Sequence, residues 1–212
     1  LADFLFAPDE KAVSNLVALK VKGQIEETTM NTGIESLEKN IEEVEHASGP
    51  VIATLHRVEN LHRKKRLKGF SKLLEEVTKK GQEVLFVLHQ PTEEILKKHG
   101  IIEEIEEIGI KIVPLIPYKE FVKKIASAPY VITDGGSIQE ETAHLGVPCL
   151  LWRGKTERQN GLGQNVVISN YDKKTCEAFL NDFESYRTEI RSQHSNPSSQ
   201  VVDVLTQIMK KV

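Results

Sequence analysis

The sequence predicts an α/β fold in which a parallel sheet carries helices on both faces. From residue 51 to residue 170, short apolar runs alternate with amphipathic segments, which is the pattern of parallel strands joined by right-handed helical crossovers. The run at residues 84–88, VLFVL, is apolar throughout, as is typical of a strand covered on both faces. With 39% hydrophobic and 28% charged residues over 212 positions, the chain is able to bury a core.

The first 48 residues are predicted to hold one strand and two helices. Residues 4–7 read as a strand ended by Pro8, and the acidic residues after Pro8 suit the first turn of a helix. Spacings of +3, +4 and +3 place four apolar residues on one face of a second helix: Ile34, Leu37, Ile41 and Val44. Gly49 and Pro50 then break the helical pattern.

Six strands and five helices are predicted from residue 51 onward, followed by a last helix. The strands are expected at residues 51–55, 84–88, 111–115, 130–133, 149–152 and 166–169. The helices are expected at residues 67–77, 92–99, 119–126 and 138–145 and from residue 173 onward. Gly81 stands where a C-terminal helix cap belongs. After a polar stretch at residues 192–199, a final amphipathic helix carries Val202, Leu205, Ile208 and Met209.

Charge and cysteine usage exclude several classes of protein. Twenty-eight Lys and Arg against 31 Asp and Glu give a net charge of −3, so the whole chain has no attraction to nucleic acid or to a membrane surface. Cys149 and Cys176 lack metal-ligand spacing, which argues against a zinc ribbon and a disulfide scaffold. No apolar run approaches the ~18 residues of a membrane helix, and no signal pattern opens the chain. We therefore expect a cytoplasmic protein.

The chain begins Leu-Ala-Asp without an initiator Met. We expect it to be a processed protein or a piece of a longer one.

Ligands of parallel sheets bind at the carboxyl ends of strands, and the loop at residues 133–141 carries the strongest signal there. Gly135 and Gly136 let the backbone approach a ligand, and Ser137 with its neighbouring amides suits a phosphate at a helix start. Glu141 would repel a phosphate but accept hydrogen bonds from ribose hydroxyls. Together these features predict a nucleotide site. The alternative is a plain turn with Ser137 as helix N-cap and Glu140 as its capping partner.

Two further loops at strand ends contain several charged residues. Residues 54–60 contain His56, Arg57, Glu59 and Asn60, and cations ahead of a helix N-terminus favour an anionic ligand because the helix dipole does not stabilise them. His56 is suited to act as an acid or a phosphate ligand. The alternative is that residues 54–60 are a solvent-exposed, charged connection between the strand and the next helix.

The loop at residues 153–163 holds Arg153, Lys155 and Arg158, enough positive charge to neutralise a diphosphate. A mobile surface loop is the alternative interpretation. For three other side chains, residue type and position favour a structural role. These are His89 as a lone histidine, Phe121 as a helix residue facing the protein core, and Trp152 as a packing residue.

Together these loops resemble one family, the non-hydrolysing UDP-N-acetylglucosamine 2-epimerases. Its Thr-x-His-Arg-x-Glu-Asn segment matches residues 54–60, and its Thr-Asp-Ser-Gly-Gly-Ile-Gln-Glu-Glu segment matches residues 133–141. Its Leu-Gly-x-Pro and Thr-Glu-Arg motifs match residues 145–148 and 156–158. Two motifs depart from the pattern: Gly135-Gly136-Ser137 replaces Ser-Gly-Gly, and His89-Gln90-Pro91-Thr92 replaces His-Pro-Asn-Pro. These departures indicate a divergent subgroup.

The resemblance implies a two-domain GT-B fold of which this chain is the C-terminal, Rossmann-like half. Residues 1–48 would be the inter-domain segment from the end of the N-terminal domain. Residues 49–190 would form the UDP-binding domain, and residues 191–212 the C-terminal tail and helix.

The resemblance also implies roles for site residues. Phe121 would lie against the base and Glu141 on the ribose. The loop Gly135, Gly136 and Ser137 would hold UDP together with Arg158 on the diphosphate. His56 would lie near the diphosphate and assist catalysis, and Arg57 and His89 match positions of a regulatory UDP-sugar site in bacterial members.

The implied activity is that of an isomerase. It would interconvert UDP-N-acetylglucosamine and UDP-N-acetylmannosamine, or a related UDP-sugar, by eliminating UDP and adding it back. The carboxylates for proton transfer at C2 would come from the missing N-terminal domain, no metal or other cofactor is implied, and a homodimer is expected. The alternatives are a UDP-sugar glycosyltransferase of GT-B fold and a non-catalytic UDP-sugar binding module.

Overall fold

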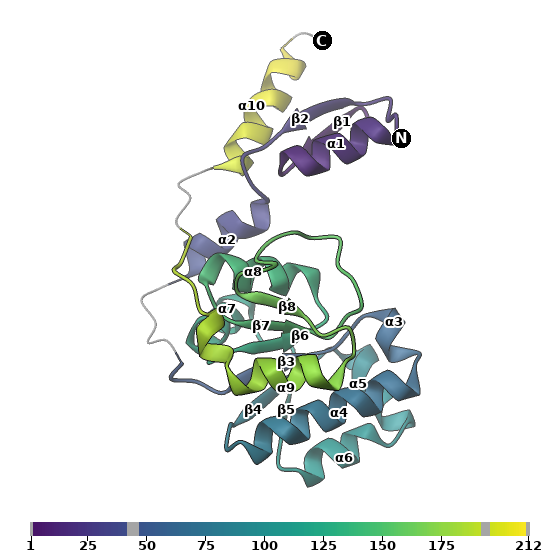
Figure 1. Ribbon diagram of the computed structural model, residues 1–212. Helices are drawn as coiled ribbons and strands as arrows, with labels where there is room; N and C mark the ends of the chain where they lie inside the picture. The colour runs from purple at the N-terminus through teal and green to yellow at the C-terminus, as the bar shows by residue number, and fades with distance from the viewer. Residues whose placement is uncertain (1, 42–46, 192–195, 211–212) are drawn as a thin grey trace. The chain divides into compact units, whose positions relative to one another are not determined.

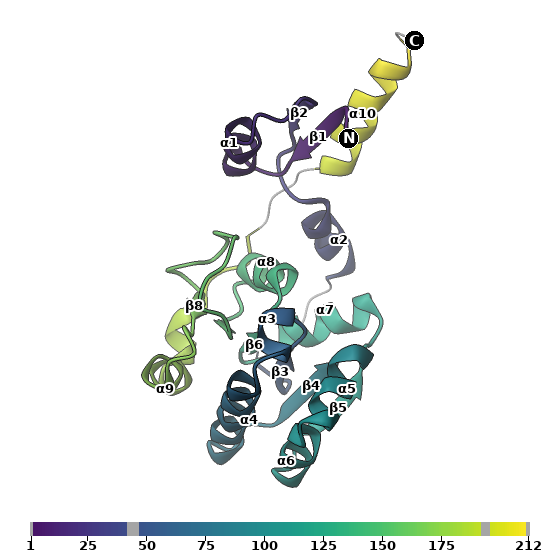
Figure 2. The same ribbon diagram turned by 90° about the vertical axis from the view of Figure 1, so that its right-hand side faces the viewer.

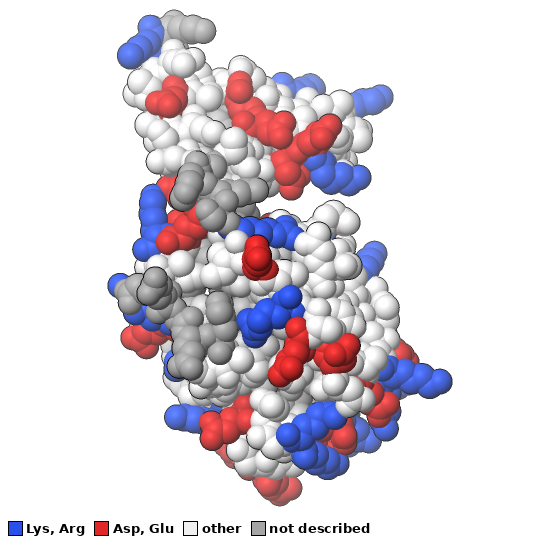
Figure 3. Space-filling view, turned by 60° about the vertical axis from the view of Figure 1, so that its left-hand side comes forward, with Lys and Arg blue, Asp and Glu red and all other residues white. Residues whose placement is uncertain are grey.

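The computed structural model describes residues 2–41, 47–191 and 196–210. Its contacts divide the chain into two compact units, one formed by residues 1–39 with 192–212 and the other by residues 40–191. The predicted helix position Val44 lies outside the described residues. Over the face in Figure 3, Lys and Arg side chains are interspersed with Asp and Glu side chains, in keeping with the near-neutral composition.

The larger unit is built on a six-stranded parallel sheet (Figure 1). Its strands are β3 (Val51–Thr54), β4 (Val84–Leu88), β5 (Lys111–Pro114), β6 (Val131–Thr133), β7 (Cys149–Leu151) and β8 (Val166–Ile168). All neighbouring strands pair in parallel. Every predicted strand from residue 51 onward is confirmed, with ends shifted by at most one residue.

Helices cover both faces of this sheet, as predicted (Figure 2). They are α3 (Val58–Leu61), α4 (Lys64–Lys79), α5 (Gln90–Lys98), α6 (Ile101–Glu107), α7 (Tyr118–Ser127), α8 (Gly136–Leu145) and α9 (Lys173–Asn181), followed by a 3₁₀ turn at Phe183–Tyr186. Two of these helices, α3 and α6, are absent from the predicted set. The residues of α3 fall almost wholly within the segment 54–60, which was expected to be a loop, and Gly100 ends the helical pattern one residue before α6 begins. Gly100 adopts the left-handed conformation at φ 66°, which turns the chain between the two helices.

The main core lies between the sheet and the helices α4, α6 and α9. The predicted face of α4 is fully buried: Leu67, Phe70, Leu74 and Val77. The Phe70 ring lies 5.6 Å from that of Phe86 and 5.9 Å from that of Trp152. The predicted packing role of Trp152 is thereby confirmed. On the opposite face, α8 packs Ala143 against Cys149, Leu151 and Val166.

The smaller unit contains β1 (Phe4–Ala7), α1 (Glu10–Ala18), β2 (Gln24–Glu27), α2 (Thr32–Asn40) and α10 (Pro197–Met209). The prediction missed β2, which pairs in parallel with β1, because QIEE has only one apolar residue. Asp9 caps α1 by accepting the N–H of Ala12 at 2.7 Å, as its place before the helix suggests. The apolar side chains of α10 are largely exposed, Met209 by 78%, so its predicted apolar face is not buried by the described chain.

Candidate functional site

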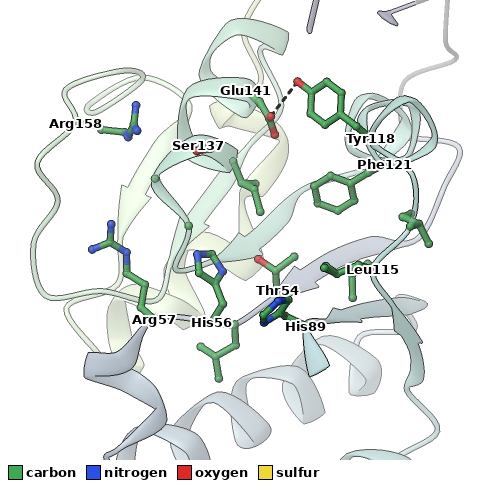
Figure 4. Close-up of a pocket in the computed structure, with 16 residues that line it drawn as sticks. Thr54, His56, Arg57, His89, Leu115, Tyr118, Phe121, Ser137, Glu141 and Arg158 are labelled. Carbon is green, nitrogen blue, oxygen red and sulfur yellow. Dashed lines mark hydrogen bonds between the residues drawn. The ribbon is translucent and has the colours of Figure 1, made fainter. Parts of the chain in front are cut away.

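The strand order places one functional crevice in the larger unit. In the order β5-β4-β3-β6-β7-β8, the chain adds strands on one side of β3 up to β5 and then crosses back to add β6, β7 and β8 on the other side. Ligands of such sheets bind outside the carboxyl ends of the strands, at the point between β3 and β6 where the strand order switches sides. A cavity of about 700 Å³ lies there. Its wall is formed by the ends of β3, β4, β5 and β6, by α7 and α8, and by the loop that carries Arg158 (Figure 4). All nine site residues expected from the sequence line it: His56, Arg57, His89, Phe121, Gly135, Gly136, Ser137, Glu141 and Arg158.

The two glycines of the 133–141 loop allow two cavity side chains to approach the start of α8. A Cβ at Gly135 would lie 2.8 Å from Cε1 of His56, and a Cβ at Gly136 would lie 2.7 Å from Nε of Arg158. The first amides of a helix have no acceptor within the helix and favour anions. His56, Arg158 and the start of α8 therefore bring together the kinds of group that would suit an anion, at what we call the anion corner.

The alternative interpretation, in which Ser137 caps α8, is wrong. The helix begins two residues before the expected start, at Gly136, and Gly135 occupies the N-cap position. Ser137 is exposed in the first turn. Gly136, Ser137 and Ile138, the first residues of α8, all line the cavity.

Glu141 lies at the other end of the cavity. Its side chain is buried, and the phenol of Tyr118 donates a hydrogen bond to its Oε1 at 3.1 Å. Burial raises the pKa of Glu141 to about 7. The second oxygen, Oε2, is buried and has no hydrogen-bond partner in the described part of the chain. A carboxylate of this kind has unused accepting capacity, which suits hydroxyl groups.

Tyr118 and Phe121 stand on the same helix, α7, across the cavity from Glu141 (Figure 4). The expectation from composition that Phe121 is a core residue is wrong, because its ring is only partly buried and lines the cavity. Tyr118 was not predicted as a site residue. Its position one turn before Phe121, directly after Pro117, was the signal available in the sequence.

Carboxylates accompany the arginines of this site. Arg158 pairs with Glu140, and Nη2 of Arg57 donates to Glu157 at 2.8 Å. Arg153 is buried and also donates to Glu157, at 2.8 Å. Of the three cations predicted to meet a diphosphate from the 153–163 loop, only Arg158 lines the cavity.

Gln139 and Thr156 fasten that loop to α8. The buried side chain of Gln139 donates to the carbonyl oxygens of Arg158 and Asn160 at 3.2 and 3.0 Å, and accepts the hydroxyl of Thr156 at 2.7 Å. Thr156 in turn accepts the N–H of Arg158 at 3.2 Å. These bonds argue against the interpretation of a mobile surface loop. Sequence reasoning missed both residues, although each lies inside a motif that it singled out.

His56 and His89 meet the same cavity from neighbouring strands. His56 follows β3 with its side chain 47% exposed, while His89 is the exposed N-cap residue of α5. Arg57 and His89, expected at a regulatory site, thus line the cavity that also holds Phe121, Glu141 and Arg158.

Among the described residues, no group of three His, Cys, Asp or Glu side chains is arranged to hold a metal ion. None of the helices in the described ranges is long and apolar enough to cross a membrane.

Comparisons with known proteins found similar sequences and similar structures. The family model described as UDP-N-acetylglucosamine 2-epimerase matches residues 1–203. UDP-N-acetylglucosamine 2-epimerases of Methanocaldococcus jannaschii and Methanococcus maripaludis are 27% and 30% identical over 84% and 79% of this chain. The chain covers only 53% and 50% of those two proteins. A solved structure of the M. jannaschii enzyme in complex with UDP-GlcNAc and UDP superposes with a TM-score of 0.84 at 24% identity, covering 97% of this chain and 61% of that one.

Proposed function

The chain belongs to the UDP-N-acetylglucosamine 2-epimerase family, and on that premise we propose that it is the UDP-binding half of such an isomerase. The whole enzyme would interconvert UDP-N-acetylglucosamine and UDP-N-acetylmannosamine, or a related UDP-sugar, by eliminating UDP and adding it back. The observation that carries the proposal is the order of groups along one cavity: an anion-binding helix start with Arg158, a buried carboxylate at Glu141, and an aromatic ring at Phe121.

That order matches the parts of UDP. The diphosphate would lie on the first turn of α8 between Arg158 and His56, where Gly135 and Gly136 leave room for both side chains. The ribose hydroxyls would donate to Glu141, and the uracil ring would pack on Phe121. Glu140 holds Arg158 before the ligand arrives, so a phosphate would have to compete with it for the guanidinium.

The same groups would assist the departure of UDP. Breaking the bond between the sugar and the diphosphate leaves negative charge on a phosphate oxygen. Preorganised donors aimed at such developing charge lower the barrier. In this chain the donors are the amides at the start of α8, Arg158 and the imidazole of His56.

We assign the removal and return of the C2 proton to a domain outside these residues. Proton transfer needs an acid or base within ~3 Å of the reacting atom, and the chain spans about half of the relatives it matches. In this proposal residues 1–48 are the inter-domain segment, residues 49–190 the UDP-binding domain and residues 191–212 the tail and helix. The isolated pair β1 and β2 supports this assignment, because a sheet of two strands is marginal on its own. A cytoplasmic homodimer completes the proposal.

Titrating the chain with UDP in a calorimeter tests the proposed site. We expect wild-type binding, and we expect Arg158→Ala to lose about 100-fold in affinity, since a charge-assisted hydrogen-bonded pair contributes about 1.5–3 kcal/mol. Lys155→Ala is the matched control, because Lys155 is an exposed cation of the same loop that does not line the cavity. Unchanged affinity in Arg158→Ala, or equal losses in both variants, would remove the support for this assignment.

A further inference from the structure

Asp134 is a fully buried carboxylate at the point where β6 ends. Its Oδ1 accepts the backbone N–H of His56 at 3.0 Å, and its Oδ2 accepts the backbone N–H of Arg57 at 2.9 Å. Oδ2 also accepts Nδ2 of Asn60 at 2.9 Å. All three donors belong to the loop and short helix that follow β3. Asp134 therefore joins the two halves of the sheet directly beneath the cavity.

The side chain of His56 faces the same carboxylate. Its Nδ1 lies 3.4 Å from Oδ1 of Asp134, while the ring edge at Cε1 lies over Gly135, with no space for a Cβ. A carboxylate next to one ring nitrogen fixes which nitrogen carries the proton and which one faces the ligand. With Nδ1 directed at Asp134, Nε2 is the nitrogen left to serve the cavity.

Other groups around the cavity do not replace Asp134 in this arrangement. The remaining ionisable side chains that line it are Arg57, His89, Tyr118, Glu141 and Arg158. Arg57 and Arg158 are held by Glu157 and Glu140, and Glu141 is bonded to Tyr118. Among the described residues, Asp134 is the carboxylate that contacts the His56 ring.

We propose that Asp134 is the positioning residue of His56: it accepts the Nδ1 proton and presents Nε2 to the anionic group of the ligand. When Nε2 also carries a proton, that N–H donates to a phosphate oxygen. The identity of that ligand rests on the proposed function, but the Asp134–His56 relation does not.

The first test reads the protonated nitrogen of His56 directly. In ¹⁵N-histidine-labelled chain with neutral imidazoles, we expect wild-type His56 to carry its proton on Nδ1. Asp134→Asn should move it to Nε2. The amide oxygen is expected at the Oδ2 position, where Arg57 and Asn60 both donate, so the NH₂ group would face Nδ1 and Nδ1 would have to accept. Asn60→Ala is the control: it removes a different bond to Asp134 and should leave the proton on Nδ1. A wild-type His56 protonated on Nε2 would overturn the proposal even if Asp134→Asn failed to fold.

The second test separates positioning from mere support of the loop. Asp134→Asn should weaken UDP binding about tenfold in wild type and have no effect in His56→Ala, since a residue that acts through another loses its effect when that residue is gone. An equal loss in both backgrounds would mean that Asp134 only stabilises the loop. If wild type bound no UDP, the proposed function would fail, and the ¹⁵N measurement would still decide the role of Asp134.

Discussion

Replacing Gly146 by alanine is expected to destabilise the chain by about 4 kcal/mol. Gly146 ends α8 at φ 66°, and a Cβ there would lie 2.0 Å from the backbone oxygen of Thr188. The left-handed conformation alone costs a residue with a side chain about 1–2 kcal/mol. Forcing an atom into a filled site adds about 1–3 kcal/mol. Urea unfolding followed by circular dichroism measures the sum.

Gly100→Ala provides the matched control. Gly100 has the same φ of 66°, but nothing lies within 4 Å of its Cβ position. We therefore expect only the conformational cost, about 1 kcal/mol. Equal losses in the two variants would show that collision with Thr188 contributes nothing. The result bears on the site because Gly146 closes the helix that carries Glu141 and whose first turn forms the anion corner.

Glu141 is expected to make the chain less stable as the pH rises from about 4.5 to about 7. Burial raises the pKa of this carboxyl to about 7 from a model-compound value of 4.5. Between these values the folded state retains a proton that the unfolded state releases, so unfolding becomes progressively more favourable with rising pH. The full shift corresponds to about 3 kcal/mol. Glu141→Gln should abolish this dependence and be more stable than wild type at pH 8.

Tyr118→Phe provides a second test of the pH dependence attributed to Glu141. The Tyr118 hydroxyl donates to Glu141 and lowers its pKa against the effect of burial. Removing that hydroxyl should move the transition to higher pH. A wild-type stability that does not change between pH 4.5 and pH 7, measured by urea unfolding against Glu141→Gln, would contradict the buried-carboxyl assignment.

The same carboxyl should affect UDP binding in the opposite direction. Ionised Glu141 accepts ribose hydroxyls better than protonated Glu141, so affinity for UDP should rise as pH passes through 7. Glu141→Gln should lose about tenfold in affinity at pH 8, as removal of a charge-assisted hydrogen bond does. The sharper readout is 2′-deoxy-UDP: wild type should bind it more weakly than UDP, and Glu141→Gln should bind both alike. Equal discrimination by the two proteins would place the ribose elsewhere.

Much of the fold was accessible from local pattern. VLFVL is buried along its whole length as β4, and the +3, +4, +3 spacing marks the buried face of α4. The prediction failed where the local sequence has little hydrophobic periodicity or where the capping residue is not evident. The strand β2 has one apolar residue, and the start of α8 depends on backbone geometry at Gly135 rather than on the capping chemistry of Ser137.

The sequence by itself determined the alternation of strands and helices, and the loops in which binding chemistry is concentrated. Both follow from hydrophobic spacing and from residue type, which are local properties. Only the tertiary structure decided which charges serve the cavity and which serve the fold. Arg153 and Arg158 look alike in sequence, yet one is buried against Glu157 and the other lines the cavity. The groups that donate hydrogen bonds to Asp134 lie 74 to 78 positions earlier in the sequence. Such pairings are set by the order of strands in the sheet, which brings β3 beside β6, and no local pattern contains that order.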